Sequence, residues 1–193
     1  MSVANFLTAR FKGTWTEEYH LGLWEQYSRS GLADPHFEKE ITSNDDRRMW
    51  QRIWEMIVFR LLVESGHAPT SAARGPDFCF SIGDRRVFIE CTAPEPTGLP
   101  PEWLEPVDWS TIKTEVSSVP FAEILLRWTA AIKEKYDKLE GPVDRQTGRR
   151  RRSHGYRGQG IVRDNDCYVI AIDGRMLCEV ETSPRETLDF RLP

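Results

Sequence analysis

The sequence has no long hydrophobic run, no closely paired cysteines and no overall excess of positive charge. No segment approaches the roughly 18 consecutive apolar residues that a membrane-spanning helix needs. The first residues, MSVANFLTARFKG, lack the apolar region and the small-residue cleavage site of a secretory signal. The four cysteines form no CxxC pair, which argues against a zinc site and against a disulfide framework. We therefore expect a cytoplasmic protein with no membrane partner.

Acidic residues outnumber basic ones overall, but one segment is strongly basic. The formal net charge of −4 excludes a uniformly basic coat for nucleic acid, yet residues 145–163 hold seven arginines and no acid. Clustered arginines contact phosphate backbones without regard to sequence. Arg149, Arg150, Arg151 and Arg152 are therefore candidate nucleic-acid-binding residues, and the alternative is a mobile, solvated loop.

The composition is that of a folded chain. Hydrophobic residues make up 39% and charged residues 29% of the 193 residues, with seven tryptophans among them. A chain of this length buries a real hydrophobic core. We expect one sizeable α/β domain, or a core with an N-terminal appendage.

Helical patterns occupy much of the first third. A helix is expected over residues 14–30, ended by Gly31, and the following ADPHFEKEIT is expected to be a loop. A second helix is expected from a cap at Ser43 to about Ser65. Glu55 lies off the centre of its apolar face. That face follows the i, i+3, i+4, i+7 spacing and consists of Trp50, Ile53, Trp54, Ile57, Val58, Leu61 and Leu62.

Strand patterns follow in the middle of the chain. DFCFSI and RVFIECT flank Gly83-Asp84, which is a hairpin signal. A proline-rich loop over 94–110, a helix over about 119–139 and the apolar run CYVIAI come next, and that run suits a strand buried on both faces. A strand, a long helix and a strand form a crossover unit, so CYVIAI should lie parallel to one hairpin strand.

The hairpin brings two acidic residues together. With Gly83 and Asp84 as the turn, antiparallel pairing places Asp77 directly opposite Glu90, with Cβ atoms about 4.5–5.5 Å apart. Facing carboxylates repel each other unless a cation lies between them, and Mg²⁺ is commonly held by carboxylate oxygens. The alternative has Asp77 capping a turn after Pro76 and Glu90 facing water.

GPDFCF followed by VFIECT resembles the motif of the PD-(D/E)XK nuclease superfamily, the restriction-endonuclease-like fold. Its motif is Pro-Asp on one strand and an acid, any residue and lysine on the next; Pro76, Asp77 and Glu90 match it. The resemblance spans about residues 46–173. It implies a three-layer α/β core, in which helices flank a mixed sheet, over residues 46–193, with an N-terminal helical extension over residues 1–45.

The resemblance also implies an activity. Superfamily members are divalent-metal-dependent nucleases, so the expected reaction is hydrolysis of phosphodiester bonds, most often in DNA, with Mg²⁺ or Mn²⁺. Asp77, Glu90 and the backbone carbonyl of Cys91 would hold the metal, and Glu55 on the preceding helix matches a glutamate that often joins the site.

One motif position differs, because Thr92 stands where the superfamily has lysine. Some members carry that lysine on the next helix. Lys135 falls about 50° from the centre of the apolar face of the helix over 119–139, nearer than Lys133 or Arg127, and is the candidate replacement. That face consists of Phe121, Leu125, Trp128, Ile132, Tyr136 and Leu139.

Two other functions fit the same sequence. Thr92 also suits a catalytically inactive nucleic-acid-binding module with the same fold. A structural or interaction domain with incidental acids is a third reading. Many superfamily members act as dimers, so a homodimer is a further candidate assembly, although nothing in the sequence specifies an interface.

Overall fold

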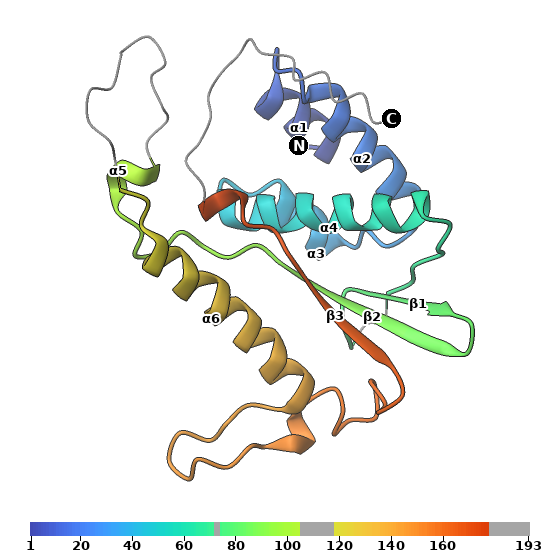
Figure 1. Ribbon diagram of the computed structural model, residues 1–193. Coiled ribbons are helices and arrows are strands. Elements are labelled where there is room, and N and C mark those ends of the chain that lie inside the picture. The colour runs from blue at the N-terminus through green and yellow to red at the C-terminus, as the bar shows by residue number, and fades with distance from the viewer. Residues whose placement is uncertain (72–73, 105–117, 178–193) are drawn as a thin grey trace, which may run out of the picture.

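The computed structural model describes residues 1–71, 74–104 and 118–177. Within them a small sheet lies between a group of helices on one side and a single long helix on the other (Figure 1). Short 3₁₀ turns cover Arg152–His154 and Arg175–Leu177. The helices and strands, in chain order, are α1 Val3–Phe11, α2 Glu17–Arg29, α3 Pro35–Ile41, α4 Asp46–Glu64, β1 Phe78–Ile82, β2 Arg85–Thr92, α5 Pro101–Leu104, α6 Phe121–Glu140 and β3 Cys167–Ile172.

The sheet has the topology that the sequence predicts. Strand β1 pairs antiparallel with β2, with Ile82 opposite Arg85, and the turn opens at Gly83, whose φ of 56° suits glycine. Strand β2 pairs in parallel with β3 in the order β1-β2-β3. The hairpin register and the parallel crossover are therefore confirmed, and the chain is α/β in class.

Strand β3 differs from expectation in its burial. It forms one edge of the sheet, and among the described residues no strand pairs with its outer side. Cys167 is exposed and Val169 retains 39% exposure. The expected burial on both faces is wrong, because an apolar run also suits an edge strand that is covered on one face only.

The hydrophobic core lies where α1 to α4 meet β1 and β2. One continuous cluster joins side chains from all six elements, and it includes Leu7, Ile41, Ile53, Phe78 and Cys91 at 1% exposure or less. The N-terminal helices thus share their core with α4 and the sheet.

Two helices in the first 45 residues were not anticipated. The stretch expected to be a loop contains α3, because the Asp34 carboxylate accepts a hydrogen bond from the Phe37 backbone N–H at 2.6 Å and Pro35 suits the first turn. The expected Ser43 cap is also wrong: α4 begins at Asp46, and Asp45 caps it. Helix α1 was not predicted at all.

Helix α4 packs most of its predicted face into the core and buries further residues as well. Leu61 is 53% exposed, whereas Met49, Met56 and Phe59 are buried, and so is Glu55 at 4% exposure. The helix contacts α2 and α3 as well as β2, so it is covered on more than one side. A single apolar stripe therefore underestimates what this helix buries.

Helix α6 departs further from its predicted face. Phe121, Leu125, Ile132 and Tyr136 are 69%, 48%, 43% and 47% exposed, respectively. The residues that α6 does bury are Ala131, Lys135 and Leu139. The helix therefore turns a stripe containing a lysine toward the rest of the molecule and leaves most of its apolar stripe outside.

Candidate functional site

Asp77 lies one residue before β1, directly after the buried Pro76. Because Phe78 pairs with Ile89, the position across from Asp77 is Glu90, as the sequence predicts. The Oδ2 atom of Asp77 accepts a hydrogen bond from the Cys91 backbone N–H at 2.7 Å. This bond crosses the hairpin and holds the carboxylate beside β2.

Glu90 is buried and fully engaged. It is 2% exposed, so the alternative in which it faces water is wrong. Its Oε1 accepts hydrogen bonds from Lys135 Nζ at 3.2 Å and from Lys138 Nζ at 2.7 Å, both on α6. Its Oε2 accepts a hydrogen bond from the Tyr156 hydroxyl at 3.4 Å. Two cations and a phenol thus surround one carboxylate.

Glu55 reaches the same region from α4. Its Oε2 accepts a hydrogen bond from Arg52 Nη1 at 2.6 Å, and its Oε1 accepts one from Gln51 Nε2 at 3.0 Å. Gln51 Nε2 also donates to the Cys91 carbonyl at 3.3 Å, and Gln51 Oε1 accepts from the Ala93 backbone N–H at 2.8 Å. Gln51 therefore connects Glu55 to the carbonyl that the resemblance assigns to a metal.

The acids perturb one another through their charges. Burial, followed by the negative charge of Asp77, raises the pKa of Glu55 to about 7, against the opposing effect of Arg52. Burial and the charge of Glu90 raise the pKa of Asp77, while its hydrogen bond from the Cys91 N–H lowers it. Three acids from three segments therefore share one electrostatic environment.

Two of the groups that donate to Glu90, Lys138 and Tyr156, keep their protons at neutral pH. Burial lowers the pKa of Lys138, but its hydrogen bond to Glu90 prevails and raises that pKa above the ordinary lysine value. Burial and the charge of Glu90 raise the pKa of Tyr156 to about 12. Lys138 is therefore a cation, and Tyr156 is a neutral hydrogen-bond donor.

Sequence reasoning missed several of these residues. Lys138 carries a usable signal, because it lies three positions after Lys135 and so shares its side of the helix. Arg52 and Gln51 carry a similar signal, because they lie three and four positions before Glu55 on α4. Tyr156 carries none, since its contact with Glu90 joins residues distant in sequence.

Within the ranges that the structure describes, no three His, Cys, Asp or Glu side chains lie close enough together to hold a metal ion. The donors that are present have the right chemistry for a hard cation. Asp77, Glu90 and the Cys91 carbonyl all offer oxygen atoms, which Mg²⁺ and Mn²⁺ prefer. The Lys135 and Lys138 amines compete with any such cation for Glu90.

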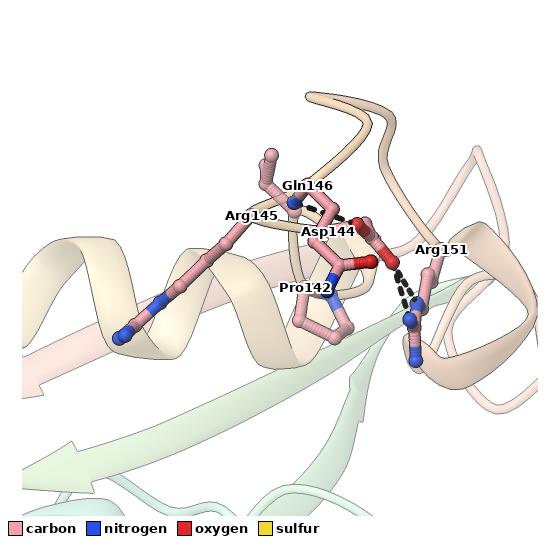
Figure 2. Close-up of a pocket in the computed structure, with 6 residues that line it drawn as sticks. Pro142, Asp144, Arg145, Gln146 and Arg151 are labelled. Atoms are coloured by element: carbon pink, nitrogen blue, oxygen red, sulfur yellow. Dashed lines mark hydrogen bonds and ion pairs between the residues drawn. The ribbon is translucent and has the colours of Figure 1, made fainter.

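The predicted arginine run divides into two kinds of residue. Arg150 Nη1 donates to Asp137 Oδ1 at 2.8 Å and to the Gly141 carbonyl at 2.6 Å. Arg151 forms an ion pair with Asp144 (Figure 2). Arg149 and Arg152 are exposed, and their side chains have no partner in the described part of the chain.

A shallow cavity of about 340 Å³ lies on the same loop. Its lining includes Pro142, Asp144 and Arg151, and none of the buried acids contributes to it. Figure 2 shows the Asp144 carboxylate held between Arg151 and the Gln146 backbone N–H. Asp144 is therefore satisfied from within the loop.

Comparisons with known proteins give no family for this chain: no protein-family model, curated protein or solved structure matches it. In the described part of the chain, no helix has both the length and the hydrophobicity required to cross a membrane.

Proposed function

We propose that this protein is a divalent-metal-dependent nuclease that hydrolyses phosphodiester bonds in DNA, built on a restriction-endonuclease-like core. The observation that carries the proposal is the placement of Asp77 and Glu90 at facing positions of the hairpin, with a lysine of α6 within 3.2 Å of Glu90. The order of α4, hairpin, α6 and parallel β3 is also the order of that superfamily's core.

The acids and one carbonyl would hold the metal. Asp77, Glu90 and the Cys91 carbonyl present oxygen donors from adjacent positions of the hairpin. Bound Mg²⁺ or Mn²⁺ lowers the pKa of a water ligand and neutralises charge on the scissile phosphate. Gln51 orients the Cys91 carbonyl, and Glu55, with a pKa of about 7, would serve as the group that accepts a proton from the attacking water.

The two lysines of α6 take the place of the motif lysine that Thr92 cannot supply. The Lys135 side chain is only 10% exposed and stays against Glu90, where it positions that carboxylate. The Lys138 side chain is 43% exposed and lies at the rim of the site. Lys138 is therefore the cation that faces the substrate phosphate as negative charge develops on it.

Cleavage of a DNA plasmid with Mg²⁺ or Mn²⁺ tests the proposal. Asp77→Asn keeps an oxygen that accepts the Cys91 N–H bond but removes the charge, so it should abolish cleavage without unfolding the protein. Asp84→Asn, at the exposed turn of the same hairpin, is the matched control and should cleave normally. Equal activity of Asp77→Asn and wild type would rule out this site.

One observation favours a second function, a nucleic-acid-binding module that does not cleave. Glu90 is completely paired by Lys135, Lys138 and Tyr156 without any metal. DNA binding with no cleavage under Mg²⁺, Mn²⁺, Co²⁺ or Ca²⁺ would favour this function over the nuclease.

A further inference from the structure

The segment between α6 and β3 holds its shape with its own ion pairs. Three of the seven arginines in residues 145–163 are used in this way. These pairs join Arg150 to Asp137, Arg151 to Asp144, and Arg157 to both Glu140 and Asp164. Arg150 also lies over the ring of Tyr136 on α6, 5.0 Å from its centroid. These arginines are structural, because each neutralises an acid of the same segment or of α6.

Close backbone packing fixes the segment further. A side chain at Gly155 would overlap backbone atoms of Glu140 and Gly141, and one at Gly158 would overlap the Arg152 carbonyl. The Tyr156 backbone N–H donates to the Lys138 carbonyl at 2.9 Å. The segment thus folds back on the end of α6. Residues carried on such a backbone lose less conformational entropy when they bind a ligand.

The other four arginines of residues 145–163 form no such ion pairs within the described ranges. Arg145, Arg149, Arg152 and Arg163 are exposed, and their side chains form no ion pair or hydrogen bond within the described ranges. Figure 2 shows Arg145 extending away from the Asp144–Arg151 pair. A folded segment with four unpaired guanidinium groups suits a polyanion whose charges repeat along its length.

This segment is anchored to Glu90 at two points. Lys138, just before it, and Tyr156, within it, both donate to Glu90. The residues between these two positions include Arg145, Arg149 and Arg152. A polyanion bound to them would therefore be held by a segment that is anchored to Glu90 at two points.

We infer that residues 141–163 form a preformed clamp for the phosphate backbone of DNA. Arg145, Arg149 and Arg152 bind phosphates, whereas Arg150 and Arg151 shape the clamp. The choice of DNA rests on the proposed nuclease function. The contacts are to phosphates only, so the clamp holds DNA of any sequence.

Fluorescence anisotropy with a short labelled DNA duplex, in EDTA and over a series of salt concentrations, tests the clamp. Arg149→Ala/Arg152→Ala should weaken binding about tenfold per arginine at ~0.1 M salt. The negative slope of log affinity against log salt should become shallower by about 2, because two phosphate contacts are lost. Lys12→Ala/Lys39→Ala removes two exposed lysines from the α1–α3 side and should change neither value. An unchanged affinity and slope for the arginine variant would overturn the clamp.

The binding assay also separates this proposal from the nuclease. Binding is measured without divalent metal, so it does not depend on cleavage. If the wild-type protein never cleaves DNA but Arg149→Ala/Arg152→Ala still binds DNA more weakly than wild type, only the nuclease proposal is refuted. A wild type that cleaves while the variant binds normally refutes only the clamp. Two duplexes of unrelated sequence should lose affinity equally. A loss confined to one sequence, or tighter binding to RNA than to DNA, would overturn the assignment to the DNA backbone.

Discussion

The two faces of the sheet are covered by different kinds of side chain. On the α1–α4 face, large apolar side chains such as Ile41, Met49 and Ile53 are fully buried. On the α6 face, Phe121 and Ile132 are exposed and the buried stripe contains Lys135. Figure 1 shows the same asymmetry, with α1 to α4 on one side of the sheet and the long helix α6 on the other. The first face supplies most of the stability, and the second carries the two lysines that hold Glu90.

Polar contacts orient the α6 face. Lys135 and Lys138 both donate to Glu90, and the Tyr168 hydroxyl donates to the Lys135 carbonyl at 3.2 Å. The buried Lys135–Glu90 ion pair therefore fixes which side of α6 faces the sheet, although most of the apolar side chains of α6 remain exposed to solvent.

The largest expected effect compares apolar residues on the two faces. Phe78→Ala removes a fully buried ring of the α1–α4 face and should lower the free energy of unfolding by about 3–5 kcal/mol. Ile132→Ala on α6 should lower it by less than about 0.5 kcal/mol, because that side chain is already half exposed. Denaturant unfolding measures both values, and equal losses would contradict the comparison.

The next effect concerns charge on the α6 face. Glu90→Gln leaves the buried Lys135 without its negative partner and should destabilise the protein by about 3 kcal/mol. Glu25→Gln breaks an exposed pair with Arg29 and should cost less than about 0.5 kcal/mol. Urea unfolding of both variants at neutral pH tests this, and a Glu90→Gln protein as stable as Glu25→Gln would show that the charge network does not hold α6.

Glu55 should make stability depend on pH. Its pKa in the folded protein is about 7, above the ordinary value of 4.5, so between these pH values the folded state holds a proton that the unfolded state releases. Stability should therefore fall as pH rises from about 4.5 to 7, by roughly 2–3 kcal/mol.

Comparison with Glu55→Gln isolates this effect. His20, whose pKa burial lowers, contributes an opposite slope in both proteins, so it cancels in the difference. Between pH 5 and pH 7.5, the free energy of unfolding should fall more in wild type than in Glu55→Gln. The same pH dependence in both proteins would show that Glu55 titrates normally.

The smallest expected effect compares two glycines. Gly155→Ala should destabilise the folded loop by about 1–3 kcal/mol, because the added Cβ overlaps the backbone at the end of α6. Gly22→Ala has open space within α2 and should stabilise the protein by about 1 kcal/mol through helix propensity. Thermal unfolding distinguishes the two signs, and a stabilised Gly155→Ala protein would contradict the close packing.

Some of this structure could be predicted because it depends on local rules. The Gly83 turn fixes the hairpin register, and the register alone places Asp77 across from Glu90. The parallel crossover of β3 follows from the length of α6. Helix α3 also has a readable signal, the Asp34 cap with Pro35 in the first turn, that outweighs the polar residues around it.

Other features could not be predicted because they depend on contacts between distant residues. The burial of Glu55 depends on the packing of α4 against β2, where Gln51 bonds to Cys91 and Ala93, which lie 40 and 42 residues later in the chain. The orientation of α6 requires Glu90, which lies 45 residues before Lys135. Apolar periodicity shows which side chains share a face, and it does not show whether anything covers that face.

The central claim is that Asp77 and Glu90 hold a divalent metal. Isothermal titration calorimetry of Mn²⁺ into wild type and Asp77→Asn at pH 7.5, with Asp84→Asn as the control, tests it most directly. We expect saturable Mn²⁺ binding in wild type and in Asp84→Asn, and we expect this binding to be lost in Asp77→Asn. No binding in wild type, or equal binding in Asp77→Asn, would contradict it.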